Sequence, residues 1–446
     1  MPKITFLGAG STVFAKNILG DCLLSDPLRD AHFALYDINT ARLRDSTMMF
    51  EALNANINQG RATITSHLGT PDRLNALTNA DYVINAIQVG GYAPCTITDF
   101  EIPKRYGLRQ TIGDTVGIGG IFRGLRTLPV MWQIANDMQS VCPDAWLLNY
   151  TNPMCILMMG LATTGTKSIG LCHSVQACVP TLLGRLGLYD KIPPTEVDWL
   201  IAGINHQAWL LRIEHQGEDL YPRIKKLAAD MNWYARESRD KRHDDMVRFE
   251  LLRHFGYYVT ESSEHTAEYM PYWINGRNPH LVEELNIPLD EYPRRCEQQI
   301  ESWESLRDRL VNAPSLTHES SHEFAASIMS AMETNTAFDF AGNVMNDGLI
   351  TNLPTQACVE VPCVADAKGV HPECIGSLPE QLAALNRTNI NPQILTVQAA
   401  RTGSRDFIYQ AAMLDPHTGA ELSLDQIRHL CDDLIEAHGN WLPRFT

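Results

Sequence analysis

Residues 3–11 are Lys-Ile-Thr-Phe-Leu-Gly-Ala-Gly-Ser, an apolar run that leads directly into a glycine turn. The first five have the composition of a buried strand, and the apolar side chains of Val13–Leu24 have helical spacing. Between them, Gly8 and Gly10 allow a tight turn and let a pyrophosphate approach the helix N-terminus, where backbone N–H groups favour anions. The stretch therefore predicts a strand–turn–helix unit that binds a dinucleotide through Gly8, Gly10 and Ser11.

Asp37 supports this interpretation, although the glycine motif is incomplete. The third glycine of the G-x-G-x-x-G pattern is absent, because residue 13 is valine. Asp37 ends the apolar run His32–Tyr36, where a carboxylate can accept hydrogen bonds from both hydroxyls of an adenine ribose. A carboxylate at this place would repel the 2′-phosphate of NADP, so the pattern favours NAD. The alternative is a glycine turn in a sheet that binds nothing.

The rest of the first 175 residues alternates short apolar runs with helical stretches, as in a parallel sheet that is covered by helices. The further strand-like runs are Ala62–Ser66, Asp81–Ile87, Ala145–Leu148 and Ser168–Leu171. Polar motifs follow several of these runs, at the carboxyl ends where such sheets bind ligands. We therefore predict an α/β fold built on a Rossmann-type, doubly wound parallel sheet, with an NAD-binding domain over residues 1–195.

The pattern changes after about residue 190. Strand-like runs at Asp198–Ile204, Gln207–Glu214 and Cys358–Val364 are mixed with helical segments, and Ser423 is the predicted N-cap of the last helix. The sequence has no repeat with a period of 20–50 residues. We predict that residues 196–446 form a mixed α/β domain that carries the substrate site, the catalytic groups and the oligomer contacts.

The composition excludes several classes of protein. The chain has 446 residues, of which 44% are hydrophobic and 20% charged, as is usual for a globular protein. The net charge of −16 argues against binding to nucleic acid, which needs clustered Lys and Arg. The longest apolar run has about nine residues, whereas a membrane span needs about 20. Eleven cysteines without a C-x-x-C pair, and the lack of a signal-peptide pattern, predict a reduced cytoplasmic protein.

Cys172 and His206 are candidate metal ligands, because each follows a strand-like run. The two residues are not at a close metal-ligand spacing, and a buried core cysteine and a hydrogen-bonded histidine are the alternative interpretation. A divalent metal that is held by one thiolate and one imidazole keeps open positions. Two vicinal oxygens of a substrate could occupy them, which is the arrangement of Lewis-acid catalysis.

Two further stretches are dense in polar groups. Residues 260–269 contain several titratable side chains, which indicates either a functional segment or a solvated loop. Residues 113–120 are rich in glycine around Asp114 and lead to Arg123, so they either hold a ligand or form a turn. Arg294 and Arg295 stand at a helix start, where they point either into a site or to the surface.

The motifs together resemble one family, the NAD- and manganese-dependent glycosidases of glycoside hydrolase family 4. The resemblance covers the whole chain, and within the family it points to the α-galactosidase branch. The strings that carry it are Ile4-Thr5-Phe6-Leu7-Gly8-Ala9-Gly10-Ser11, Asn149-Tyr150-Thr151-Asn152-Pro153, Gly170-Leu171-Cys172-His173-Ser174, Gly203-Ile204-Asn205-His206 and Glu261-Ser262-Ser263-Glu264-His265. The family itself lacks the third glycine, so its absence here agrees with the resemblance.

The resemblance implies hydrolysis of an α-galactoside by a redox and elimination route, an exception to two-carboxylate glycoside hydrolysis. NAD takes a hydride from C3 of the sugar, a base removes the proton at C2, and a divalent metal stabilises the enediolate. The C1–O bond then breaks by elimination, water adds, and the hydride returns to C3. NAD is therefore regenerated in each turnover. Mn²⁺ is the family's metal, although a site with one thiolate suits other ions too.

The resemblance also implies roles for single residues. Cys172 and His206 are the metal ligands, and Tyr269 is the base at C2. His173 is the leaving-group acid, at a position where some family members have aspartate; Glu264 and His265 are the alternatives for the acid.

Other residues are implied to bind the substrate. Asn149 and Asn152 bind the sugar and the nicotinamide end, Arg294 binds the substrate, and Asp114 supports catalysis beside the metal or the substrate. The expected partners are a small-molecule α-galactoside and further copies of the chain in a homodimer or homotetramer, with neither nucleic acid nor a membrane. A galacturonide, a 6-phosphoglycoside and an ordinary NAD-dependent dehydrogenase reaction are the alternatives.

Overall fold

One thirteen-stranded sheet runs through the protein, and both halves of the chain contribute strands to it. The computed structural model describes residues 1–313, 315–321 and 323–446. The strand order is β10-β8-β7-β12-β11-β6-β5-β4-β1-β2-β3, with β13 paired to β12 and β9 paired to β8.

The six strands of the first half are parallel and follow the order β3-β2-β1-β4-β5-β6. This order reverses direction between β1 and β4, as in doubly wound dinucleotide-binding sheets. The prediction of a Rossmann-type parallel sheet is confirmed, and each predicted strand is present to within three residues at its ends. The strands are β1 Lys3–Leu7, β2 His32–Asp37, β3 Thr63–Leu68, β4 Tyr82–Asn85, β5 Trp146–Asn149 and β6 Ser168–Gly170.

The strands of the second half extend this sheet in antiparallel pairs, so the predicted mixed α/β organisation is confirmed. Two single-residue pairings, Gly170 with Asn343 and Glu360 with Gly203, connect the antiparallel strands to each other and to β6. The strands are β7 Val197–Ile204, β8 Gln207–His215, β9 Glu218–Asp219, β10 Tyr258–Val259, β11 Phe338–Met345, β12 Cys358–Asp366 and β13 Gly369–Pro372.

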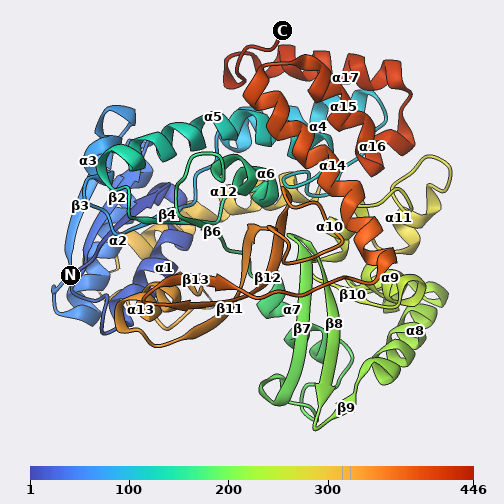
Figure 1. Ribbon diagram of the computed structural model, residues 1–446, viewed down its shortest axis with the longest axis horizontal. Helices are drawn as coiled ribbons and strands as arrows, with labels where there is room; N and C mark the ends of the chain where they lie inside the picture. Colours follow the sequence, from blue (N-terminus) through green and yellow to red (C-terminus); the bar gives the residue numbers. More distant parts are fainter. Residues whose placement is uncertain (314, 322) are drawn as a thin grey trace.

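Helices cover the sheet and form a separate cluster at the C-terminal end of the chain. Figure 1 shows α14 to α17 gathered beside α4 and α5, whereas the β7–β8 hairpin and α8 extend on the opposite side of the molecule. The helices of the first half are α1 Val13–Leu24, α2 Thr40–Asn58, α3 Arg73–Leu77, α4 Ile97–Arg105, α5 Gly117–Val141, α6 Met154–Leu161 and α7 Ser174–Arg185. Those of the second half are α8 Tyr221–Glu237, α9 Met246–Phe255, α10 Ser263–Glu268, α11 His280–Glu284, α12 Glu291–Val311, α13 Ala325–Thr334, α14 Glu380–Thr402, α15 Arg405–Leu414, α16 Pro416–Glu421 and α17 Leu424–His438.

The predicted division into residues 1–195 and 196–446 falls between β6 and β7, but the sheet continues across it. The division therefore stays a prediction, as do the homo-oligomeric state and the cytoplasmic location. Among the described helices, none has both the length and the apolar character that a bilayer span requires.

Candidate functional site

The turn after β1 has the geometry that a phosphate loop needs. Gly8 has a φ of 85°, and a Cβ there would lie 2.6 Å from the carbonyl oxygen of Ala86. A Cβ on Gly10 would lie 2.6 Å from Asp37 Oδ2. Both positions therefore require glycine, and the turn lies at the start of α1 as the sequence predicts.

Asp37 stands directly beside this turn. Its Oδ2 accepts a hydrogen bond from the Gly10 N–H at 2.7 Å, and its Oδ1 accepts one from the Asn39 N–H at 2.8 Å. A carboxylate has about four lone-pair sites, so acceptor capacity for two ribose hydroxyls is left. Ser11 Oγ is buried and has no hydrogen-bond partner among the described residues. These features fit a bound NAD.

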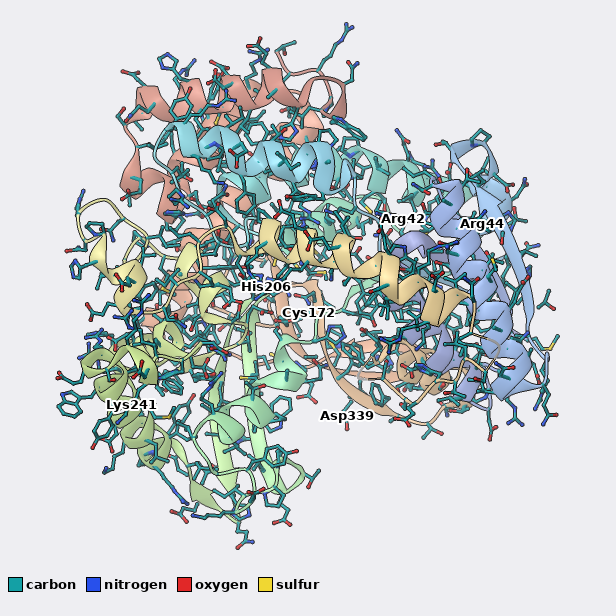
Figure 2. All side chains as sticks on the ribbon, turned by 180° about the vertical axis from the view of Figure 1, so that it is seen from behind. Arg42, Arg44, Cys172, His206, Lys241 and Asp339 are labelled. Carbon is teal, nitrogen blue, oxygen red and sulfur yellow. The ribbon has the colours of Figure 1, made fainter. Side chains whose placement is uncertain are left out.

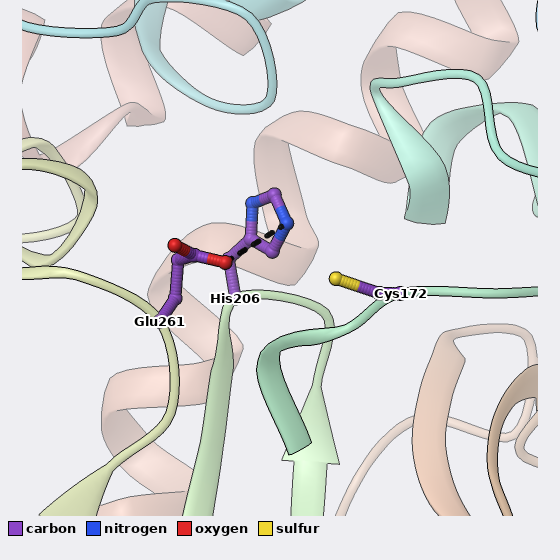
Figure 3. Close-up of side chains that lie close together, drawn as sticks. All are labelled: Cys172, His206 and Glu261. Atoms are coloured by element: carbon purple, nitrogen blue, oxygen red, sulfur yellow. Dashed lines mark ion pairs between the residues drawn. The ribbon is translucent and has the colours of Figure 1, made fainter. Parts of the chain in front are cut away.

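Cys172, His206 and Glu261 converge on one point. Their sulfur, nitrogen and oxygen atoms all lie within 4.8 Å of one another, and Figure 3 shows the three side chains directed together. Cys172 follows β6, His206 lies in the β7–β8 turn, and Glu261 follows β10. Figure 2 places Cys172 and His206 near the middle of the molecule, well away from Arg42 and Arg44 at the start of α2. Cys172 and His206 are the metal ligands expected from the sequence, whereas Glu261 is added by the structure.

The backbone of this cluster is strained. His206 and Glu261 both have a φ of 62°, in the left-handed region that side chains other than glycine rarely adopt. Each such residue costs on the order of 1 kcal/mol, and such strain is concentrated at functional sites. The surrounding fold therefore holds both side chains in conformations that direct them toward Cys172.

The electrostatics of the cluster suit a divalent cation. Burial alone would lower the pKa of His206, but the negative charges of Cys172 and Glu261 raise it to about 10. Burial would raise the pKa of Glu261, but His265 and His206 lower it to about 2. His206 Nδ1 is buried and has no hydrogen-bond partner among the described residues. One thiolate, one imidazole and one carboxylate form a donor set for a transition-metal ion such as Mn²⁺.

Asp114 extends this cluster on the side of α5. Its Oδ1 lies 3.8 Å from Nε2 of His265, and the ring centroids of His265 and His206 are 4.7 Å apart. Asn152 donates a long hydrogen bond of 3.4 Å from Nδ2 to Asp114 Oδ2. Two of the predicted site residues, Asp114 and Asn152, therefore lie together beside the metal cluster.

Tyr269, directly after α10, contacts the same cluster. Its hydroxyl donates a hydrogen bond to the carbonyl oxygen of Asn205, the residue before His206, at 3.1 Å. Burial raises the pKa of Tyr269 well above its usual value, and the thiolates and carboxylates around it act in the same direction. Tyr269 is therefore a neutral phenol here, and only a nearby cation would favour its deprotonation.

His173 lies next to the cluster and is held by a glutamate that the sequence reasoning missed. Its Nε2 is 2.7 Å from Oε2 of Glu323, and its ring stacks on Tyr150 with the centroids 6.1 Å apart. The hydrogen bond to Glu323 raises the pKa of His173, which favours its protonated form. The imidazole is nearly half exposed, so it can both hold and release a proton.

Two predicted substrate ligands are not brought into this cluster. Asn149 is fully buried, and its amide accepts a hydrogen bond from Asn85 at 2.8 Å and donates one to the carbonyl of Thr151 at 3.1 Å. Arg294 is half exposed and bonds Glu291 on its own helix at 2.6 and 2.7 Å. Asn149 shapes the turn that carries Asn152, and the substrate role of both residues stays a prediction.

Glu268 is a buried residue beside the site that was not predicted from the sequence. Glu268 accepts hydrogen bonds from the N–H groups of Thr111, Ile112 and Gly113 at 2.6 to 3.2 Å. These bonds fasten the segment that precedes Asp114 to α10. No spacing pattern in a single sequence reveals such a contact, because the two partners are more than 150 residues apart.

Comparisons with known proteins identify the family of the chain. The chain matches the model of the family 4 glycosyl hydrolases over residues 3–188 and the model of their C-terminal domain over residues 201–418. It is 60% identical to an alpha-galactosidase of Bacillus subtilis (strain 168), with both chains covered completely. It is 32% identical to an alpha-galactosidase of Rhizobium meliloti (strain 1021), covering 100% of this chain and 90% of that protein.

A solved structure shows the same fold. The 6-phospho-alpha-glucosidase from gut microorganisms, in complex with NAD and Mn²⁺, superposes with a TM-score of 0.80 over 100% of both chains, at 20% sequence identity. The predicted resemblance is confirmed by the family models and by both relatives. The chain belongs to family 4 of the glycosyl hydrolases.

Proposed function

We propose that this glycosidase hydrolyses α-galactosides and that it depends on NAD and a divalent metal, with Mn²⁺ as the expected ion. The observation that carries the proposal is the convergence of Cys172, His206 and Glu261 in a sheet that also holds the glycine turn beside Asp37. The 60% identity to the alpha-galactosidase of Bacillus subtilis supports the choice of sugar.

Separate groups of residues bind NAD and the metal. Gly8, Gly10 and Ser11 bind the pyrophosphate of NAD, and Asp37 binds the adenine ribose. When bound, NAD supplies a hydride acceptor and donor for C3 of the sugar, and the metal supplies a Lewis acid for the C2 and C3 oxygens. Cys172, His206 and Glu261 hold the metal.

Two side chains of the protein carry out the proton transfers of the reaction. Tyr269 removes the proton from C2, since its hydroxyl bonds the carbonyl of Asn205, the residue before His206, and a nearby cation would favour the deprotonated phenol. His173 donates a proton to the leaving glycosidic oxygen, and Glu323 holds its imidazole in place. Asp114 and Asn152 bind sugar hydroxyls beside the metal.

A galacturonide or a 6-phosphoglycoside carries a negative charge at C6. Binding either of them would need an Arg or Lys side chain whose charge is not already paired within the protein. Arg294 and Arg295, the arginines at the start of α12, both bond Glu291, and Arg295 also bonds Glu264 at 2.5 Å. Their charges are therefore compensated within the protein. This pairing favours the neutral galactoside over an anionic sugar.

The experiment that tests the proposal is release of nitrophenol from an aryl α-galactoside by protein that is stripped of metal and cofactor. NAD⁺ and Mn²⁺ are added singly and together under reducing conditions. We expect release only with both, and without accumulation of NADH, because the hydride returns to the sugar. Net formation of NADH would indicate an ordinary dehydrogenase, and release without NAD⁺ would contradict the proposal.

A further inference from the structure

Arg123 differs from the other buried arginines of the described residues. Arg73, Arg126 and Arg248 each bond a carboxylate within the protein, on Asp137, Asp99 and Asp245 respectively. Arg123 is 7% exposed, yet in the part of the chain that the structure describes it has no carboxylate within 4.0 Å. A buried guanidinium is costly unless its donors are used, so the arrangement points to an acceptor from outside the chain.

The hydrogen bonds that Arg123 does make are weak. Its two terminal nitrogens donate to the hydroxyl of Tyr292 at 3.4 and 3.3 Å, and Gln88 Nε2 donates to the same oxygen at 3.4 Å. A phenolic oxygen has two lone pairs, and N–H···O bonds are usually near 2.9 Å. Three long bonds to one oxygen leave most of the donor capacity of this group unused.

Tyr292 itself is well fixed. Its backbone N–H donates to the carbonyl of Thr111 at 3.0 Å, and the guanidinium of Arg123 lies 5.4 Å from the centroid of its ring. The backbone bond fixes Tyr292, and the ring of Tyr292 supports the guanidinium of Arg123, which offers the N–H donors.

The pair lies next to the segment that leads to Asp114, because the Tyr292 N–H bonds the carbonyl of Thr111. Asp114 in turn lies 3.8 Å from His265, whose ring packs against His206 of the metal cluster. Burial opposes ionisation of Asp114, but the nearby imidazole of His265 and the positive charge of Arg123 lower its pKa well below the usual range. Asp114 is thus a negative charge near Arg123 that does not bond it, so the group favours a neutral oxygen over a second anion.

We propose that Arg123 and Tyr292 bind the C6 hydroxyl of the galactosyl ring and thereby set the specificity for it. The inference rests on the proposed function, because that function places the C2 and C3 oxygens at the Cys172–His206–Glu261 cluster. C6 is on the opposite side of a pyranose ring from C2 and C3. A ring that is held at the cluster and passes Asp114 therefore presents C6 toward Arg123.

The test compares an aryl α-galactoside with the aryl 6-deoxy-α-galactoside, which lacks only the C6 oxygen. For the wild-type holoenzyme with NAD⁺ and Mn²⁺ we expect kcat/KM to favour the galactoside by about 10- to 100-fold, as for a hydrogen bond from a charged donor. In Arg123→Gln the ratio should fall to within a few-fold of one. Tyr292→Phe keeps the ring and should reduce the ratio partially.

Arg109→Gln is the matched control. Arg109 is another arginine of the same segment, but it is half exposed and bonds Asp290 at 2.6 Å, so its loss should leave the ratio unchanged. A ratio in Arg123→Gln that equals the wild-type ratio, with both substrates slowed alike, would show a merely structural role and overturn the inference.

A binding measurement distinguishes failure of this inference from failure of the proposed function. Calorimetry of galactose against 6-deoxygalactose on the NAD⁺- and Mn²⁺-loaded protein needs no turnover. If the wild type releases no nitrophenol, the proposed function fails, but tighter binding of galactose that disappears in Arg123→Gln still supports the subsite. Equal binding of the two sugars to the wild type overturns it.

Discussion

Glu261 shows at the scale of single residues why part of a site is invisible in one sequence. A glutamate in an acidic segment has the composition of a solvated loop, and its distance along the chain from Cys172 and His206 follows no ligand spacing. Only the fold brings the three together and imposes a φ of 62° on both His206 and Glu261. Cys172 and His206 became candidates because each directly follows a recognisable strand, and the resemblance to the family made them the expected metal ligands.

Replacement of Cys172 by serine tests the metal cluster. A serine hydroxyl is a poor ligand for a transition metal, so we expect at least about a 100-fold loss of activity at limiting Mn²⁺. The thermal midpoint of the stripped protein should stay close to that of the wild type. Metal content after dialysis and nitrophenol release are the measurements. Cys374→Ser, at an exposed thiol, is the control and should be fully active.

Replacement of Tyr269 by phenylalanine tests the base. The ring and its burial are kept, and only the hydroxyl that bonds the Asn205 carbonyl is lost. We expect kcat to fall by about 10²- to 10⁴-fold, the usual contribution of a general base, while bound metal and NAD affinity stay the same. A kcat within threefold of the wild type would assign the base to another residue.

At the scale of elements, the sequence predicts what depends on local patterns. The run 3–11 predicts β1, its glycine turn and α1, and Ser423 is the N-cap of α17, where it forms a capping box with Gln426. The three hydrogen bonds from residues 111–113 to Glu268 have no such local signature. A helix or strand can be predicted when the residues that determine it are neighbours in the sequence. Contacts between elements that are far apart in the sequence cannot be predicted in this way.

Replacement of Glu268 by glutamine tests how α10 positions the segment before Asp114. The amide offers one oxygen in place of two and brings an N–H₂ group toward backbone donors, so we expect a loss of about 1–3 kcal/mol in stability. Because Asp114 lies next to this segment, kcat should also fall while metal content is retained. Measurements are denaturant unfolding and steady-state kinetics; an unchanged kcat would show that the contact serves only stability.

At the scale of the whole molecule, a buried charge network helps to join the C-terminal helices to the first half of the chain, beside a hydrophobic cluster that both parts share. Arg126 on α5 bonds both oxygens of Asp99 on α4 at 3.1 and 2.6 Å, and His438 at the end of α17 contacts Asp99 at 2.9 Å. The network crosses the predicted domain division, and so does the sheet. The sequence predicts two domains because the pattern of strand-like and helical runs changes near residue 190. That pattern carries no information on how the two halves of the chain are joined.

Replacement of Arg126 by methionine tests this connection. It removes the arginine partner of the buried Asp99 and leaves His438 beside it, and breaking one partner of a buried pair typically costs about 3–5 kcal/mol. Urea unfolding should show this loss as a lower midpoint. Arg212→Met, at an exposed ion pair with Asp198, is the control and should change stability by less than about 1 kcal/mol. Equal effects of the two changes would contradict the account.

If the glycosidic bond breaks by elimination after the proton at C2 has been removed, the released sugar carries a record of that step. Hydrolysis of the α-galactoside in D₂O with NAD⁺ and Mn²⁺, followed by NMR of the released galactose, detects it. We expect deuterium at C2 of the product, because the proton that Tyr269 removes exchanges with solvent before it returns. Complete hydrolysis with only hydrogen at C2 would rule out elimination and would assign the protein a direct displacement at C1.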